Sequence, residues 1–160
     1  MKIRTVQADD SSVLRQLVVE LQAAEAESNS YTRDGELMAD QYVAQLYVGD
    51  PDVPGEVLVA ELDDGEVVGY VAVQPNVPQE EPHERFYHYA YISDIAVLVS
   101  HRGKGIGRAL LSSAENYAHA AGATVIRMGV LAGNGSARRL YSACGFAERE
   151  LLLEKSLEDK

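Results

Sequence analysis

The chain has 160 residues, of which 46% are hydrophobic, and carries a formal net charge of -11. This is the size of one domain with its own core, so we expect a single domain over residues 1–160. The acidic balance argues against nucleic acid or an anionic membrane surface as a partner, because both require a basic protein surface. A cationic amine substrate is compatible with the same charge.

Cysteine usage and the N-terminus bear on metal binding and location. The one cysteine, Cys144, excludes an intrachain disulfide and a cysteine-based metal cluster, and we predict no metal site. Residues 1–5 lack the apolar core of a signal peptide, and no apolar run approaches membrane-spanning length. We therefore expect a cytoplasmic protein without a membrane partner.

The N-terminal part predicts one strand and two helices. Residues 2–7 alternate weakly and predict a strand. Apolar residues then recur at helical spacing from Val13 to Leu21 and again from Leu37 to Leu46, which predicts two helices.

Strand patterns dominate the middle of the chain. Residues 57–62 and 67–73 flank Asp63-Asp64-Gly65, which predicts a hairpin, because type I′ turns need positive φ. A loop rich in proline and acid is expected over residues 75–82, followed by a long strand over residues 86–99.

The C-terminal part alternates helices and strands. A helix is predicted over residues 109–121, a strand over 124–131, a short helix over 134–144 and a final strand within 148–155. The complete order is β-α-α-β-β-β-α-β-α-β. It predicts a mixed sheet with helices and not the strict alternation of a doubly wound fold.

Residues 102–108, Arg-Gly-Lys-Gly-Ile-Gly-Arg, stand between a predicted strand and a predicted helix. Glycines allow close backbone approach to an anion, and the first amides of a helix attract negative charge, so this segment predicts a phosphate-binding loop. Walker A is excluded, since Arg108 and Ala109 follow Gly107 where Lys and Ser or Thr are needed. Leu110 replaces the third glycine of the dinucleotide fingerprint.

The remaining pattern is Arg-x-x-Gly-x-Gly, made by Arg102, Gly105 and Gly107. Together with the preceding strand it resembles the acetyl-CoA loop of the GNAT superfamily of N-acetyltransferases. Downstream, Asn134, Tyr141 and the Gly-Phe pair that follows resemble the GNAT segment Asn-x6-Tyr-x3-Gly-Phe. The resemblance implies the GNAT fold, an α/β (α+β) class with a mixed, mostly antiparallel central sheet and helices on both faces.

The same resemblance implies acetyl-CoA as the cofactor and coenzyme A as the product. It places the pyrophosphate on the amides of residues 103–108, the pantetheine arm along residues 95–97, and a backbone amide of that strand at the oxyanion. The cofactor-binding residues it implies are Ile95, Ala96, Val97, Arg102, Gly103, Lys104, Gly105, Ile106, Gly107, Arg108 and Asn134.

Tyr141 is implied as the general acid that protonates the departing thiolate. A phenol with a pKa of about 10 stays protonated at neutral pH and can donate to sulfur. The alternative for Tyr141 is a core aromatic beside Leu140 and Cys144, and Asn134 can be a helix cap as well as a cofactor contact.

The general base is less clearly marked. Some GNAT enzymes use a glutamate where this chain has Gly129, which cannot act as a base. Asp94 is the nearest acid on the strand before the glycine loop, followed by Glu84. Strand alternation places Asp94 on the face opposite Ser93 and Ile95 without telling which face meets the substrate. A structural or substrate-binding carboxylate is the alternative for Asp94.

The predicted reaction is direct acetyl transfer to a primary amine, either a small cationic amine or a protein or peptide amine. Glu80, Glu81 and Glu84 favour a cationic acceptor, and the aromatic run at Tyr87, Tyr89 and Tyr91 can hold a cation or simply pack in a strand. A homodimer is expected by family analogy alone. Two alternatives stay open: an acyl-CoA-binding sensor or partner module of the same fold, and a nucleotide-phosphate enzyme using the same loop.

Overall fold

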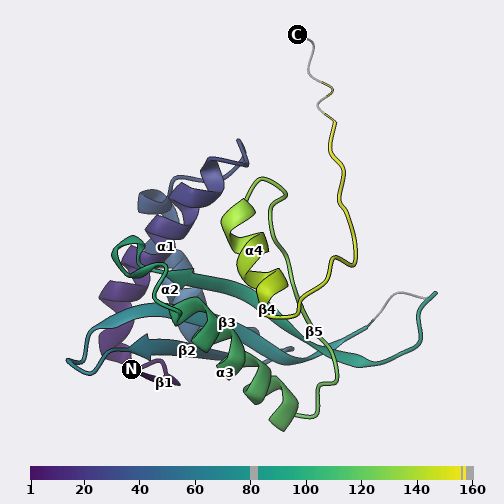
Figure 1. Cartoon of the computed structure of the whole chain (residues 1–160), viewed down its shortest axis with the longest axis horizontal. Coiled ribbons are helices and arrows are strands. Elements are labelled where there is room, and N and C mark those ends of the chain that lie inside the picture. The colour runs from purple at the N-terminus through teal and green to yellow at the C-terminus, as the bar shows by residue number, and fades with distance from the viewer. Residues whose placement is uncertain (80–82, 156, 158–160) are drawn as a thin grey trace.

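One five-stranded sheet forms the centre of the computed structural model, which describes residues 1–79, 83–155 and 157 (Figure 1). Its strands lie in chain order, the first four antiparallel and the fifth parallel to the fourth. The sheet is thus mixed and mostly antiparallel, as predicted. The strands are β1 (Lys2–Thr5), β2 (Glu56–Glu61), β3 (Val67–Pro78), β4 (His88–Val97) and β5 (Ile126–Met128).

Within the described residues, four α-helices cover the two faces of this sheet: α1 (Ser11–Ala26), α2 (Gly35–Val48), α3 (Ile106–Ala120) and α4 (Gly135–Ala143). α1 packs on α2 and on β3 and β4, whereas α3 packs across β2, β3 and β4 (Figure 1). Gly69 of β3 faces α3, because a Cβ there would lie 3.2 Å from the Leu110 side chain. The next residue, Tyr70, therefore faces the α1 side. The predicted helices on both faces are confirmed.

The middle of β3 is buried throughout, and this follows from the two helical layers. Residues 67–73 include Val68, Tyr70 and Val71, each 0% exposed. A strand covered on both faces reads as a continuous apolar run, which is what the sequence has here.

β4 carries an irregularity that matters for the site. Asp94 pairs with Ala72 and Ile92 pairs with Val73, so Ser93 is an extra residue on β4. Such a bulge redirects the side chains that follow it. β5 pairs only with residues 90–92 of β4, so in the described part of the chain the second edge of residues 93–97 has no strand beside it.

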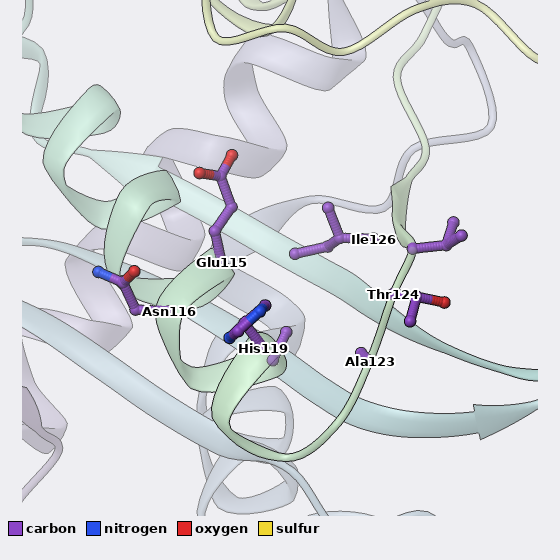
Figure 2. Close-up of a pocket in the computed structure, with 8 residues that line it drawn as sticks. Glu115, Asn116, His119, Ala123, Thr124 and Ile126 are labelled. Carbon is purple, nitrogen blue, oxygen red and sulfur yellow. The ribbon is translucent and has the colours of Figure 1, made fainter.

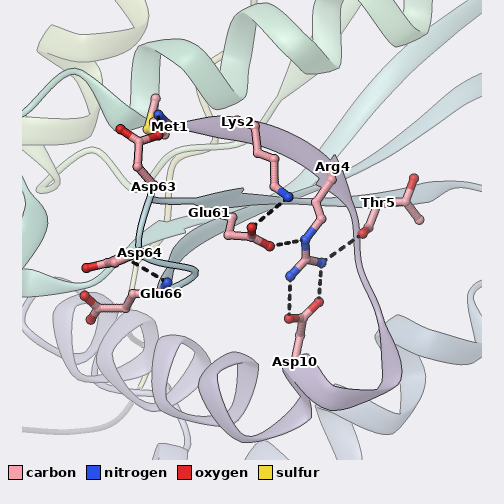
Figure 3. A network of polar contacts seen from close by, with 9 residues as sticks. All are labelled: Met1, Lys2, Arg4, Thr5, Asp10, Glu61, Asp63, Asp64 and Glu66. Carbon is pink, nitrogen blue, oxygen red and sulfur yellow. Dashed lines mark hydrogen bonds and ion pairs between the residues drawn. The ribbon is translucent and has the colours of Figure 1, made fainter.

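A network of ion pairs fastens β1 to β2 and to the start of α1 (Figure 3). Arg4 donates two hydrogen bonds to Asp10, of 2.7 and 2.9 Å, and one to Glu61 of 2.5 Å. The backbone amide of Gln7 also donates to Asp10, at 2.7 Å. The pKa of Asp10 is lowered, and the hydrogen bonds from the Arg4 guanidinium are the largest cause. Both carboxylate oxygens of Asp10 thus accept hydrogen bonds from Arg4.

The predicted final strand within residues 148–155 is wrong. These residues form no strand, and Figure 1 shows the C-terminal segment leaving the sheet. Leu151, Leu152 and Leu153 are 74%, 97% and 89% exposed. Three consecutive leucines do not alternate between two faces, and no described strand pairs with them.

Other boundaries also shift. β3 runs to Pro78, so the predicted loop over residues 75–82 begins inside a strand. Pro75 sits where the register with β4 is irregular, the place where a strand tolerates a residue without an amide hydrogen. α3 begins three residues before the predicted start, and β5 is shorter than the predicted strand 124–131. Residues 80–82, with Glu80 and Glu81, lie outside the described residues. Among the helices of the described ranges, none is long and apolar enough to span a membrane.

Candidate active site

The glycine loop has the geometry that an anion requires. Gly103 and Gly105 have φ values of 77° and 83°, in the left-handed region that favours glycine. Apart from each glycine and its two chain neighbours, no heavy atom lies within 4 Å of the position that a Cβ would take, so the space in front of them is open. Gly105 is the N-cap of α3, and the first three amides of the helix, at Ile106, Gly107 and Arg108, have no acceptor inside it. A pyrophosphate fits this loop.

The basic side chains of the loop are exposed, and two of them also hold neighbouring elements. Arg102 donates to the carbonyl of Val97 at 3.1 Å, which ties the loop to the end of β4. Arg108 donates to the carbonyl of Ala143 at 3.2 Å, which ties α3 to α4. A guanidinium has five donors, so each arginine keeps others for an anion. Lys104 is exposed as well.

The junction of α3 and α4 gives two predicted cofactor residues a second role. A Cβ at Gly107 would lie 3.0 Å from the Leu140 side chain, so glycine lets the two helices meet closely. Asn134 is the N-cap of α4, and its Oδ1 accepts from the Ala137 amide and the Ser136 hydroxyl, both at 3.1 Å. Asn134 is therefore a helix cap, which leaves its amide nitrogen for another partner.

Tyr141 lies on α4 with its ring against the core. Its ring centroid is 6.1 Å from that of Phe146, and its hydroxyl makes no hydrogen bond within the part of the chain that the structure describes. Burial, with the Glu25 carboxylate as the smaller cause, raises the pKa of Tyr141 to about 12. The phenol therefore stays protonated at neutral pH, as a general acid must.

Asp94 faces the α1 and α2 layer. The hydroxyl of Tyr42, on α2, donates to Asp94 Oδ2 at 2.7 Å. Burial raises the pKa of Asp94, while hydrogen bonds from Tyr42 and Ser93 oppose that rise. A carboxylate with a raised pKa is a better proton acceptor than an ordinary surface aspartate. Strand alternation alone did not tell which face of the sheet Asp94 occupies. In the structure, Asp94 lies on the face that carries Tyr70.

Tyr70 was missed by sequence analysis. It lies opposite Ala96 in the register of β3 and β4, two residues from the partner of Asp94, so both side chains share one face. Its side chain is 0% exposed, and its hydroxyl has no hydrogen-bond partner among the described residues. Burial first, then Asp94, Tyr42 and Glu25, raise the pKa of Tyr70.

Glu25, in the last turn of α1, was also missed. Burial and then the charge of Asp94 raise its pKa, and its own charge acts on Tyr42, Tyr70 and Tyr141. Three residues later, the Ser28 hydroxyl lies 2.5 Å from where a Cβ of Gly133 would be, so the end of α1 touches the segment that leads into α4. A signal was present: Glu25 continues the apolar stripe of Leu14, Val18 and Leu21 at helical spacing.

Electrostatic interactions thus link Asp94 with three residues that were not predicted, and one of these three, Glu25, also acts on Tyr141. The cleft cluster, as we call it below, consists of Glu25, Tyr42, Tyr70, Asp94 and Tyr141. It is built from both helices of one layer, two central strands and α4. It combines groups that release a proton with groups that accept one.

Two tyrosines of the aromatic run, Tyr87 and Tyr89, hold a cation of the chain itself. The Arg127 guanidinium lies 4.2 Å from the Tyr89 ring centroid and 5.3 Å from that of Tyr87, so the chain's own cation occupies it. Glu84, the second candidate base, pairs with both Arg127 and Arg149. Gly129 lies beside Tyr91, whose hydroxyl would be 3.7 Å from a Cβ there.

A hollow of about 290 Å³ lies elsewhere, between the last turns of α3 and the start of β5 (Figure 2). Glu115, His119 and Ile126 line it, together with their neighbours, and none of the predicted site residues does. The glycine loop is at the opposite end of α3. In the described residues, no group of three or more acidic, histidine or cysteine side chains is placed to hold a metal ion.

Comparison with known proteins places this geometry in a family. The family model described as "Acetyltransferase (GNAT) family" matches residues 18–146. The chain is 28% identical over 127 residues to the uncharacterized N-acetyltransferase YycN of Bacillus subtilis strain 168, covering 78% of this chain and 76% of that protein.

Two solved structures share the fold. A mutant of the BH1408 protein from Bacillus halodurans superimposes with a TM-score of 0.85 at 22% identity, covering 99% of this chain and 100% of that one. Aminoglycoside N-acetyltransferase AAC(6')-Iy in complex with CoA gives a TM-score of 0.70 at 15% identity, covering 97% and 93%. The chain belongs to the GNAT family, whose acetyltransferases use acetyl-CoA as the acetyl donor.

Proposed function

We propose that this protein transfers the acetyl group of acetyl-CoA directly to a primary amine, either a small cationic amine or a peptide amine. The observation that carries the proposal is the cleft cluster, in which a protonated phenol, Tyr141, and a carboxylate with a raised pKa, Asp94, both interact electrostatically with Glu25. The chemistry needs one group of each kind.

Three segments of the chain would hold the cofactor. The amides of residues 103–108 would hold the pyrophosphate, with charge from Arg102, Lys104 and Arg108. The unpaired edge of Ile95, Ala96 and Val97 would pair with the pantetheine arm, and the free amide nitrogen of Asn134 would contact it further along. Bound there, acetyl-CoA would supply a thioester whose carbon–sulfur bond breaks as the carbon–nitrogen bond forms.

The proton transfers can be assigned to side chains so that they balance. Asp94 takes one proton from the ammonium, and the free amine then attacks the carbonyl carbon. The electron pair of the broken carbon–sulfur bond goes to sulfur, and Tyr141 gives its proton to that sulfur. Tyr141 is reprotonated by the second proton that the nitrogen loses, and Asp94 releases the first to solvent. The products are the N-acetyl amine and coenzyme A.

Two kinds of support favour a cationic acceptor. The cleft cluster contains two carboxylates, Asp94 and Glu25, and no lysine or arginine of the described residues pairs with either. Among the relatives, an aminoglycoside N(6')-acetyltransferase of Klebsiella aerogenes is 28% identical over 106 residues.

The test is release of coenzyme A with a panel of amines, with the acetylated product identified by mass spectrometry. We expect Tyr141→Phe to lower kcat at least a hundredfold, since a positioned acid contributes about 10² to 10⁴. Tyr117→Phe is the matched control, because Tyr117 lies on α3 outside the cleft cluster. Equal, background release by the wild type and Tyr141→Phe would favour a non-catalytic acyl-CoA-binding protein instead.

A further inference from the structure

The C-terminal segment, by which we mean residues 148–155, exposes a run of apolar side chains to water. Leu151, Leu152 and Leu153 are 74%, 97% and 89% exposed, on a stretch without helix or strand. A single exposed leucine is ordinary on a protein surface, whereas a contiguous group of them marks an interaction surface. The segment therefore has the composition of a part that is covered when a partner is bound.

Two ion pairs fix the start of the C-terminal segment. Arg138 of α4 pairs with Glu148. Arg149 pairs with Glu84, which also pairs with Arg127, the middle residue of β5. The segment thus starts beside β5, and from there it runs away from the sheet of its own chain (Figure 1).

The outer edge of β5 is a site to which such a segment can add. Among the described strands, β5 pairs with β4 alone, and an edge strand with free amides and carbonyls is a template for another strand. On one face of β5, Ile126 and Met128 pack against the core but are only partly buried. The hollow of about 290 Å³ opens beside Ile126 (Figure 2). A cavity of about 150 Å³ can hold a benzene molecule, so this hollow has room for a leucine side chain.

The C-terminal segment and the β5 edge match on both faces. In an extended chain, Leu151 and Leu153 share one face, and Leu152 lies on the other face between Glu150 and Glu154. The first pair of leucines would continue the apolar face of β5. The two acids would then lie on the face that carries the arginine of β5, and opposite charges on neighbouring strands attract each other.

These observations favour a second copy of the chain as the partner. The segment has six residues beyond Arg149, whereas β5 has three. Because the segment starts beside the middle of β5, pairing within one chain would use only part of either. A second copy removes this restriction. In a two-fold exchange each copy contributes both a segment and an edge, which doubles the contact area toward the roughly 800 Å² per partner of stable interfaces.

We propose that residues 150–155 of one copy add as a strand to the β5 edge of a second copy, and reciprocally, in a two-fold symmetric dimer. Leu151 and Leu153 then lie beside Ile126 and Met128, and one of the two leucines enters the hollow. Backbone hydrogen bonds give affinity to such an added strand, and the burial of one face fixes its register. The inference concerns assembly and does not depend on acetyl transfer.

Size-exclusion chromatography with light scattering measures the mass in solution. For the wild type we expect twice the mass of one chain. The double variant Leu151→Asp, Leu153→Asp should have the mass of one chain, because two carboxylates would then face an apolar edge. Both leucines are exposed within a single chain, so the fold of that chain should be retained. Leu37→Asp is the matched control, at a leucine of α2 that is 80% exposed, and should remain a dimer.

Disulfide trapping distinguishes exchange between copies from pairing within one chain. With Cys144→Ala as the background, chains that carry Met128→Cys are mixed with chains that carry Leu151→Cys or Leu153→Cys. Neighbouring strands bring residues of one face within disulfide reach. We expect a link between the two kinds of chain in at least one mixture, and none when either kind is oxidised alone.

Three results would overturn the proposal. The first is a wild type with the mass of one chain at every concentration. The second is a dimer that persists with both aspartates, since it would use another surface. The third is a chain carrying Met128→Cys together with Leu151→Cys or Leu153→Cys that forms its link internally and stays a monomer, because the segment would then cover the edge of its own chain.

Discussion

Two clusters of carboxylates in this molecule have opposite surroundings. In the network at β1, hydrogen bonds from Arg4 lower the pKa of Asp10, and hydrogen bonds from Lys2 and then Arg4 lower the pKa of Glu61 (Figure 3). In the cleft cluster, Asp94 receives hydroxyl donors alone and Glu25 none from any side chain, and both have raised pKa values. The first arrangement stabilises the fold. The second retains carboxylates at a cost in stability, which is typical of functional sites.

Breaking the paired cluster should give the largest loss of stability. Arg4→Ala leaves Asp10, whose side chain is 8% exposed, without its cation. We expect a loss of about 2–4 kcal/mol, below the range for a fully buried pair because Arg4 is itself partly exposed. Urea unfolding measures it.

The matched control is Arg15→Ala. Arg15 also pairs with two acids, Glu36 and Asp40, but at the exposed surface of α1 and α2. We expect a much smaller loss there, since exposed ion pairs contribute little. Equal losses of stability in the two variants would show that the ion pair of Arg4 with Asp10 contributes no more than an exposed ion pair.

The pH dependence of stability should have opposite signs at the two clusters. Because the pKa of Asp10 is lower in the folded chain than its unfolded value of about 3.9, its contribution is complete above that value and is lost as pH falls through the folded pKa. The raised pKa values of Asp94 and Glu25 mean that stability falls as pH rises from about 4 through those folded values.

Urea unfolding between pH 3 and pH 8 can separate these contributions. Asp10→Asn should reduce the stability that is lost as the pH falls. Glu25→Gln should reduce the stability that is lost as the pH rises from about 4 to neutrality. A decline that is unchanged by Glu25→Gln would contradict the raised pKa of that group.

Removing the unpaired hydroxyl of Tyr70 should give the smallest change in stability, and this change should be a gain. Tyr70→Phe deletes a buried oxygen without a partner, so we expect stability to rise by about 1 kcal/mol. Thermal unfolding measures the gain. Tyr42→Phe is the contrasting variant, because it deletes a hydroxyl that donates to Asp94 and should destabilise the protein at pH values where Asp94 is ionised. A loss of stability in Tyr70→Phe would mean that its hydroxyl has a partner in solution.

The sequence allowed much of the fold to be predicted, because apolar periodicity and the Asp-Gly turn are local signals. It also located the glycine loop, in which Gly103 and Gly105 have positive φ values. The C-terminal strand was wrong because Leu151 to Leu153 are apolar without alternation, and apolar character alone does not supply a strand partner.

The candidate site could be assembled only in part from the sequence. The downstream motif suggested Tyr141 and strand position suggested Asp94, but Glu25, Tyr42 and Tyr70 come from three other elements. Their meeting depends on how α1 and α2 cross the sheet and on the bulge at Ser93, which single-sequence periodicity does not reveal. An acid or tyrosine within an apolar helical stripe, as at Glu25 and Tyr42, is the signal that could have marked them.

One pair of variants tests the central claim most directly, that Asp10 is retained for stability and Asp94 for acetyl transfer. The measurement is kcat for amine acetylation together with the free energy of unfolding, for Asp10→Asn and Asp94→Asn, at pH 7.5. We predict that Asp94→Asn lowers kcat about a hundredfold and raises stability by about 0.5–2 kcal/mol, whereas Asp10→Asn lowers stability and keeps kcat. An Asp94→Asn variant that keeps full activity, or loses as much stability as Asp10→Asn, would contradict the account.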